Sequence, residues 1–238
     1  MDRPKRSKTI QRIALALFFL GGFAILYPVS RMDHRFGEPR HYFPVDVIPK
    51  TVDGKVINDT IWHRIPEFSF IDQEGRIIDR SHIDGRIAVV DFFFTSCRTI
   101  CPPMQRQMRN LIWELDDEYF EEVRFLSFTV DPEYDTPEVL KAYAKQMEAD
   151  TSRWSFATGP KEEIYKLGVE GFFLTTQEDL EAEGGFLHSE KFVLVDKEGH
   201  IRGLYNGTDS DEVRDLEEDI KMLLGMERKA AKRKKKGL

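Results

Sequence analysis

The fold of this chain is decided by the stretch Ile87-Ala-Val-Val-Asp-Phe-Phe-Phe-Thr-Ser-Cys-Arg-Thr-Ile-Cys-Pro-Pro-Met104. Its first half is almost continuously apolar and rich in β-branched and aromatic residues, which is typical of a central strand buried on both faces. Its second half ends in two prolines, which suit the first turn of a helix, and apolar residues then recur at helical spacing up to Leu115. The stretch therefore predicts a strand-to-helix corner.

The only two cysteines of the 238 residues, Cys97 and Cys101, lie at this corner. Residues i and i+4 share a helical face, so both sulfurs can reach one side of the chain, and the helix N-terminus favours thiolate over thiol. Thiolates are the nucleophiles of disulfide exchange and also the soft ligands that select Cu(I). A plain disulfide is an alternative, although it would close a small loop and remove little chain entropy. The spacing does not match a structural zinc site, which needs further ligands.

Strands and helices alternate on both sides of the corner. Either Asp135 or Thr136 can cap a helix that has Pro137 in its first turn. The alternation, with a final hairpin and helix, predicts an α/β sandwich in which helices cover a mixed sheet. The predicted strands cover 68–72, 76–79, 87–95, 123–130, 154–157, 192–196 and 200–205, and the predicted helices cover 102–115, 137–147, 161–168 and 211–224.

The N-terminal region has the pattern of a membrane anchor. An uncharged apolar run covers 13–30, near the short end of what crosses a bilayer, and no Ala-x-Ala-like cleavage site follows it. Five basic residues precede the run and only Arg31 follows closely, which predicts that residues 1–12 are a cytoplasmic basic segment and that the rest is exported. A secretory signal cleaved near Ser30 is the alternative.

The remaining segments are predicted from composition. Residues 31–64 mix prolines, glycines and charges with no sustained period and are expected to be a linker, followed by a globular domain at 65–225. Residues 226–238 are expected to be a basic disordered tail. The net charge is −7 overall and about −18 for residues 13–227 once both basic ends are set aside, which argues against binding of nucleic acid.

A metal at the cysteines would need a third ligand, and the chain has six histidines. His188 stands in the glycine-containing segment 184–190, just before a predicted strand, where a flexible loop could bring its imidazole over the cysteines. From its surroundings alone, a hydrogen-bonded loop histidine is the simpler interpretation. Met104 and Met108 have the spacing of core residues rather than ligands. The other histidines are interpreted as exposed loop residues: His34, His41, His63, His82 and His200.

Three motifs in sequence order resemble the Sco/SenC family of copper-binding assembly proteins. They are the cysteine motif at 91–104, Ser127-Phe-Thr-Val-Asp-Pro-Glu-Tyr-Asp-Thr-Pro-Glu138, and Leu187-His-Ser-Glu-Lys-Phe-Val-Leu-Val-Asp196. The resemblance covers roughly residues 65–225 and implies a thioredoxin-like fold. It also implies that Cys97, Cys101 and His188 bind copper as Cu(I) and Cu(II), with the cysteines as a redox-active pair.

The resemblance implies a function as well. It predicts a copper chaperone held in the bacterial inner membrane by one helix, with its domain on the periplasmic side, that assists assembly of the dinuclear copper centre of cytochrome c oxidase subunit II. Its expected partners are that subunit or a similar copper acceptor, and a copper donor or thiol reductant. One departure is Arg98, where the family usually has proline, and this cation is expected to favour thiolate at Cys97.

Other functions remain open from the sequence. The main alternative is a thiol-disulfide oxidoreductase that reduces partner cysteines in the cell envelope. A peroxide-reducing enzyme on the same fold would need a single peroxidatic cysteine with its own activating pocket. A structural or adaptor role would leave both cysteines dispensable.

Overall fold

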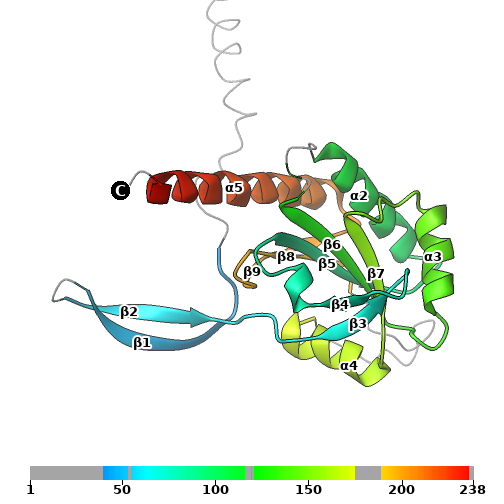
Figure 1. The fold of residues 1–238 in the computed structure, drawn as a ribbon, viewed down its shortest axis with the longest axis horizontal. Helices are drawn as coiled ribbons and strands as arrows, with labels where there is room; N and C mark the ends of the chain where they lie inside the picture. The colour runs from blue at the N-terminus through cyan, green and yellow to red at the C-terminus, as the bar shows by residue number, and fades with distance from the viewer. Residues whose placement is uncertain (1–39, 53–54, 116–118, 120, 175–188, 236–238) are drawn as a thin grey trace, which may run out of the picture. The chain divides into compact units, whose positions relative to one another are not determined.

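A computed structural model describes residues 40–52, 55–115, 119, 121–174 and 189–235 (Figure 1). The predicted cytoplasmic segment 1–12, the predicted transmembrane segment 13–30 and His188 lie outside the described residues. Across the ranges that are described, no helix combines the length and the apolar character that crossing a membrane requires.

A seven-stranded mixed sheet forms the centre of the domain, in the order β4-β3-β7-β6-β5-β8-β9. Strands β5, β6 and β7 run parallel, and every other neighbouring pair is antiparallel. The sheet confirms the predicted α/β class. The strands are β3 (Ser69–Asp72), β4 (Ile77–Asp79), β5 (Ile87–Phe93), β6 (Val123–Thr129), β7 (Trp154–Thr158), β8 (Lys191–Val195) and β9 (Ile201–Asn206).

Helices cover both faces of this sheet. Helices α2 and α3 connect parallel strands that step in the same direction along the sheet, so right-handed crossovers place both helices on one face. Helix α5 contacts α2 and β9, whereas α4 lies on the opposite face (Figure 1). The helical elements are α2 (Cys101–Glu114), α3 (Pro137–Gln146), α4 (Lys161–Lys166) with the π-helical turn η3 (Leu167–Gly171), α5 (Ser210–Lys235) and the 3₁₀ turn η1 (Arg80–His82).

The core lies on both faces of β5, all of whose residues are buried. Adjacent strand residues point to opposite faces, and the two phenylalanines at the end of β5 show this. Phe92 packs edge-on against Phe172, which follows η3, with ring centroids 5.6 Å apart. Phe93 packs against Tyr143 of α3 on the other face, at 5.4 Å. The aromatic run before the cysteines thus anchors the corner in both halves of the core.

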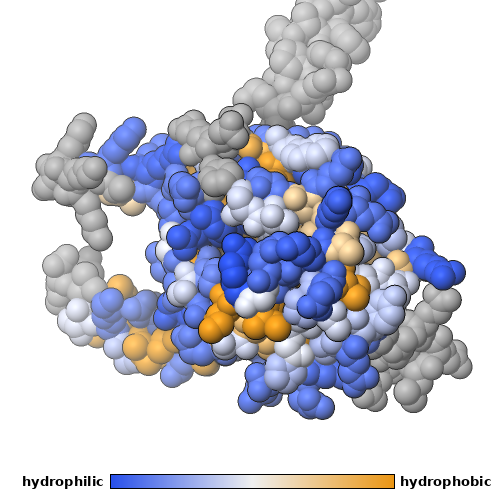
Figure 2. Space-filling model, turned by 45° about the vertical axis from the view of Figure 1, so that its right-hand side comes forward, coloured by the Kyte–Doolittle hydropathy of each residue, from blue (hydrophilic) through white to orange (hydrophobic). Residues whose placement is uncertain are grey.

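The prediction that residues 31–64 form an irregular linker was wrong for the described residues 40–52 and 55–64. Strands β1 (Pro44–Val52) and β2 (Lys55–Trp62) form a separate two-stranded antiparallel hairpin. The hairpin is rich in β-branched residues, which favour strands, and proline is tolerated in edge strands because fewer N–H groups must pair there. Figure 2 shows apolar side chains on it, at the lower left, and those more than one third exposed are Val45, Val47, Ile48, Val56, Ile57 and Ile61.

The expected disordered tail from residue 226 was also wrong where the chain is described, because α5 continues through Lys235. Alanine, lysine, arginine and glutamate all have high helix propensity, so the tail's composition supports a helix as well as a solvated coil. Ion pairs join this part of α5 to the domain. Lys197 Nζ lies 2.5 Å from a carboxylate oxygen of Glu227, and Arg228 Nη2 lies 2.8 Å from one of Glu122.

Candidate metal and thiol site

The two cysteines lie at the corner that the sequence predicts. Strand β5 ends at Phe93, a loop follows, and α2 begins at Cys101. Cys101 is 3% exposed and Cys97 is 8% exposed, so both thiols are buried and Cys97 is the one nearer to solvent. No disulfide joins them. The structure therefore brings together two of the three predicted ligands as a pair of free thiols.

Cys97 caps the start of α2 with its sulfur. The residue at the conventional capping position, Ile100, makes no side-chain cap, and the prolines at 102 and 103 have no N–H to donate. The backbone N–H of Cys101 donates to Cys97 Sγ at 3.5 Å. Cys97 Sγ also lies 3.7 Å from the Thr99 hydroxyl oxygen. A sulfur in this position receives both a hydrogen bond and the positive end of the helix dipole.

The two thiols differ in acidity because their surroundings differ. Burial acts to raise the pKa of Cys97, but hydrogen bonds with the backbones and side chains of Cys101 and Thr99 outweigh it and hold that pKa below its ordinary value. Burial raises the pKa of Cys101 far above its ordinary value, against one backbone hydrogen bond from Phe94, and the neighbouring Cys97 adds to the rise. Cys97 is therefore the thiol that ionises first.

Arg98 follows Cys97 directly but is exposed. It is not among the leading causes of the lowered pKa of Cys97, which are burial and the hydrogen bonds with Cys101 and Thr99. The lowered pKa of Cys97 that was expected from this cation is thus produced mainly by the hydrogen bonds at the start of α2.

Asp135 ties the loop before Cys97 to the neighbouring strand. It is fully buried and accepts hydrogen bonds from the Thr95 backbone N–H at 3.1 Å, from the Thr95 hydroxyl and from the Thr129 hydroxyl. The sequence suggested Asp135 or Thr136 as a helix cap. The structure assigns the cap to Thr136, whose hydroxyl accepts from the Val139 N–H at 3.5 Å. Asp135 is a positioning residue that sequence reasoning missed, although it lies in the 127–138 motif.

Asp91 is a second missed residue, in the middle of β5 and fully buried. One of its carboxylate oxygens accepts from the Gln105 side chain and the other from the Ser127 hydroxyl, both at 2.5 Å. Burial raises its pKa to about 7, although these two hydrogen bonds act to lower it. The charge of Asp91 is also one of the influences that raise the pKa of Cys101.

His188, the third predicted ligand, lies outside the described residues, and the strand that follows it bears on the prediction. Strand β8 pairs antiparallel with β5, with Val193 opposite Val90 and Val195 opposite Ala88. Earlier residues of β8 therefore lie level with later residues of β5. The start of β8 lies beside the end of β5 that leads into the cysteine loop.

All four of the other histidines that the structure describes, His41, His63, His82 and His200, are part-buried rather than fully exposed. His41 and His200 lie on either side of Asp196. The Nε2 of His63 donates to the Gly171 carbonyl at 2.8 Å. His34 lies outside the described residues.

Comparison with known proteins matches residues 62–225 to the family model SCO1/SenC. The SCO1 protein homolog of Bacillus subtilis is 33% identical over 169 residues, covering 71% of this chain and 86% of that protein. A solved structure of BsSco, a member of the Sco family of cytochrome c oxidase assembly proteins with a disulfide switch, is 33% identical with a TM-score of 0.60, covering 68% of this chain and 93% of that one. Copper-bound yeast Sco1 shares the fold at 22% identity and a TM-score of 0.54, covering 67% of this chain and 89% of that one. The chain belongs to the SCO1/SenC family.

Proposed function

We propose that this protein is a copper chaperone that carries copper on Cys97, Cys101 and His188 and assists assembly of the copper centre of cytochrome c oxidase. The observation that carries the proposal is the pair of free, buried thiols at one helix start, where the N–H of Cys101 points at the sulfur of Cys97. Membership of a family whose members bind copper and act in oxidase assembly supports it.

The donor set fits copper as cargo. Two thiolates are soft ligands that suit Cu(I), and an imidazole from His188 would add a ligand that also suits Cu(II). Copper would pass to an acceptor by ligand exchange, in which the acceptor's cysteines replace those of this chain one at a time. Burial of both sulfurs protects the thiolates from oxidation and leaves Cys97, nearer to solvent, as the side from which an acceptor approaches.

The proposal includes a location. The apolar run 13–30 with its preceding basic residues would hold the chain in the inner membrane by one span, with the domain on the periplasmic side. The copper acceptor would be oxidase subunit II or a similar protein, reached from the periplasmic side of the membrane.

Copper titration of the reduced full chain in detergent tests the site. We expect one equivalent of Cu(I) to bind the wild type, Cys97→Ser and Cys101→Ser each to weaken binding more than about a hundredfold, and His188→Ala to weaken Cu(II) more than Cu(I). His82→Asn is a matched control, because His82 precedes β5 whereas the cysteines follow it. A Cys97→Ser chain that binds copper as tightly as the wild type would show that the metal lies elsewhere.

A second function, thiol-disulfide exchange, is favoured by the difference in acidity between the two cysteines. The Cys97 thiolate would attack a partner disulfide, form a mixed disulfide and release one partner thiolate. Cys101, once deprotonated, would then attack Cys97 Sγ and release the second partner thiolate. Two electrons pass to the partner, and this chain is left with a Cys97–Cys101 disulfide.

Trapping separates this function from copper transfer. Cys101→Ser stops the reaction after its first step, so a mixed disulfide between Cys97 and a partner should accumulate, whereas Cys97→Ser should give none. Accumulation that is unaffected by a copper chelator supports thiol exchange, and failure of Cys101→Ser to trap any partner argues against it.

A further inference from the structure

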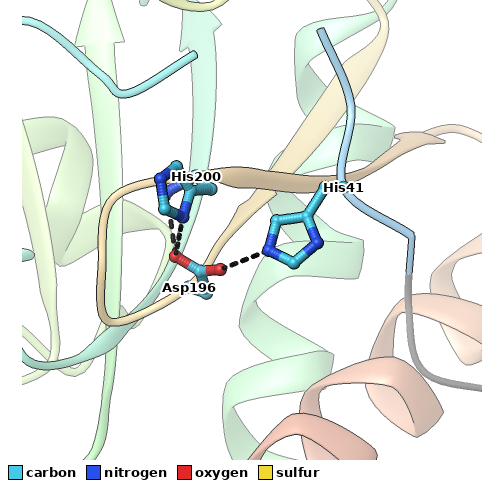
Figure 3. A group of neighbouring side chains, drawn as sticks. All are labelled: His41, Asp196 and His200. Carbon is cyan, nitrogen blue, oxygen red and sulfur yellow. Dashed lines mark hydrogen bonds and ion pairs between the residues drawn. The ribbon is translucent and has the colours of Figure 1, made fainter. Parts of the chain in front are cut away.

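Three side chains with metal-ligating atoms converge at the turn between β8 and β9 (Figure 3). His41 comes from the segment before β1, Asp196 follows β8, and His200 precedes β9. The His41 Nε2 atom lies 3.8 Å from one oxygen of Asp196, and the His200 Nδ1 atom lies 3.6 Å from the other. All three ligand atoms lie within 4.8 Å of one another. None of these residues belongs to the cysteine site.

Asp196 is held rigidly at the centre of the cluster. It is 1% exposed, and its Oδ1 accepts from the backbone N–H groups of His200 at 2.8 Å and Glu198 at 3.1 Å. Its Oδ2 accepts from Arg202 Nη1 at 3.0 Å. These hydrogen bonds account for the burial of Asp196 and for its role in stabilising the turn. They do not explain why two imidazoles from distant parts of the chain face it.

Two contacts bring His41 to the turn: one is made by the backbone of the next residue and the other by its own ring. The N–H of Tyr42 donates to the Ile201 carbonyl at 3.1 Å, which pairs this segment with β9. The His41 ring stacks on Trp62, with centroids 5.1 Å apart and planes inclined by 20°. The position of this imidazole beside Asp196 therefore follows from the fold rather than from a single free side chain.

The two imidazoles are not simply hydrogen-bonded to the carboxylate. Separations of 3.6 and 3.8 Å exceed the usual length of a hydrogen bond. Burial and the positive charge of Arg202 lower the pKa of His41, against the opposing charge of Asp196, which favours a neutral imidazole. A neutral imidazole presents a lone pair that can bind a metal ion.

The spacing of the ligand atoms suits a small divalent ion after a modest adjustment. Metal–nitrogen and metal–oxygen bonds of about 2.0–2.2 Å place tetrahedral ligand atoms about 3.3 Å apart. The separations of 3.6 and 3.8 Å, one to each carboxylate oxygen, exceed this value by a few tenths of an ångström, and no two of the three ligand atoms are more than 4.8 Å apart. Arg202 opposes the ion by its charge, so moderate rather than very tight affinity is expected.

The cluster lies at the far end of β5 from the cysteines. Val195, next to Asp196, is opposite Ala88, whereas Cys97 follows the other end of the strand. At about 3.3 Å per residue, the strand separates the two places by roughly 15 Å or more. A metal ion at the cluster would therefore bind independently of Cys97.

We propose that His41, Asp196 and His200 form a second metal site, for a divalent transition-metal ion. Two imidazoles and a carboxylate are borderline-to-hard ligands, unlike the soft sulfur pair, so the site takes Cu(II) or Zn(II) rather than Cu(I) and binds Cu(II) the more tightly. An ion there joins the segment before β1 to the β8–β9 turn. It would thus fasten the hairpin-bearing part of the chain to the sheet.

The test uses the full chain in detergent, in two backgrounds that lack the first site. One background carries Cys97→Ser, Cys101→Ser and His188→Ala together. The other is the wild type with its two cysteines oxidised to a disulfide. Calorimetric titration with Zn(II) and with Cu(II) should show one equivalent in both backgrounds, with Cu(II) the tighter. His41→Gln and His200→Asn should each weaken binding more than about tenfold. His82→Asn, which changes a part-exposed histidine outside the cluster, should leave it unchanged.

Two further readouts show whether the ion lies at the cluster. Bound Cu(II) should give an electron paramagnetic resonance spectrum with splitting from two imidazole nitrogens, reduced to one in either histidine variant. Zn(II) should raise the unfolding temperature of each background chain but not of the variants. Circular dichroism checks that the variants fold, and the backbone N–H of residue 200 that supports the turn is kept in His200→Asn. Equal binding with and without the histidines, or no binding in either background, overturns the proposal.

Discussion

Replacing Asp91 by asparagine should stabilise the protein at neutral and alkaline pH. Asp91 is fully buried, and burial raises its pKa to about 7 from an ordinary value of 3.8. Well below pH 3.8 the carboxyl is protonated in both folded and unfolded chains. Between pH 4 and pH 7 the unfolded chain loses this proton whereas the folded chain keeps it. The folded state therefore binds more protons in this range, and its stability falls as the pH rises through it.

The size of the effect follows from the pKa difference. A difference of about 3 pKa units at about 1.4 kcal/mol each amounts to on the order of 4 kcal/mol. This is the stability that the wild type loses between pH 4 and pH 8 because of Asp91, and the asparagine variant should not lose it. The gain at pH 8 will be reduced by whatever hydrogen bonding the new amide fails to reproduce.

The surroundings of Asp91 can accept the amide. The Ser127 hydroxyl, which also accepts from Trp154 Nε1 at 2.9 Å, would donate to the new amide oxygen. The buried Gln105 Oε1 has no hydrogen-bond partner in the structure, so turning that side chain by half a rotation offers an acceptor for the new amide nitrogen. Asp91→Asn therefore removes a buried charge and keeps two hydrogen bonds at residue 91, at the cost of the Gln105 amide nitrogen, which loses its present acceptor.

Urea unfolding of the reduced, metal-free chain from pH 4 to pH 9 measures the prediction. The matched control is Asp72→Asn, since Asp72 is equally buried but lies 2.7 Å from Arg76 Nη2 and accepts from two backbone N–H groups. That change removes a paired charge and should destabilise the protein by about 1–3 kcal/mol at pH 8. If Asp91→Asn is no more stable than wild type at pH 8, or if its advantage does not grow between pH 5 and pH 8, the reasoning about Asp91 is refuted.

Three further predictions concern the cysteine corner. Iodoacetamide at pH 7.5 should alkylate Cys97 faster than Cys101, because the pKa of Cys97 is lowered and that of Cys101 raised; equal rates by mass spectrometry would contradict this. Cu(I) affinity should fall as the pH is lowered, since Cys101 must release its proton to bind; a flat competition titration from pH 6 to pH 9 would exclude Cys101 as a thiolate ligand. Asp135→Ala should cost about 2–4 kcal/mol in urea unfolding because three donors lose their acceptor, whereas the exposed Glu133→Ala should be neutral.

Most strands and helices of the domain could be predicted because their signals are local. The apolar run at 87–95 becomes β5 (Ile87–Phe93), and the prolines with helically spaced apolar residues become α2 (Cys101–Glu114). The short hairpin at 68–79 and the closing helix from 211 are also confirmed within a few residues. These elements depend on periodicity and on turn residues, both of which can be read within a short window.

The hairpin β1–β2 could not be predicted in the same way because local signals conflict there. Pro44 and Pro49 argue against strands, and the charges between them hide the alternation. The dipeptide Asp53-Gly54 is the one local sign of a hairpin turn in this segment, and the two prolines argue against it. An edge position makes the prolines tolerable, and only the folded arrangement shows that both strands are edges.

The members of the site could be predicted only in part. Cys97 and Cys101 were evident from their spacing, but Asp135 and Asp91 act through contacts with residues that are far along the chain, such as Thr129 and Ser127. No periodic pattern reveals such contacts. The same reason explains why His41 and His200 were interpreted as separate loop residues, since they meet only when the segment before β1 pairs with β9.

The difference in acidity between the two cysteines links the two proposed functions and sets them in competition. Ionised Cys97 can begin either reaction, because it can attack a disulfide or bind a copper ion without further change. The second step requires Cys101, whose pKa is raised by burial, to lose its proton. A soft metal ion at Cys97 would favour that loss by offering Cys101 a positive partner, whereas a mixed disulfide at Cys97 carries no charge to do so. Copper bound to Cys97 should therefore recruit Cys101 more readily than a partner disulfide does.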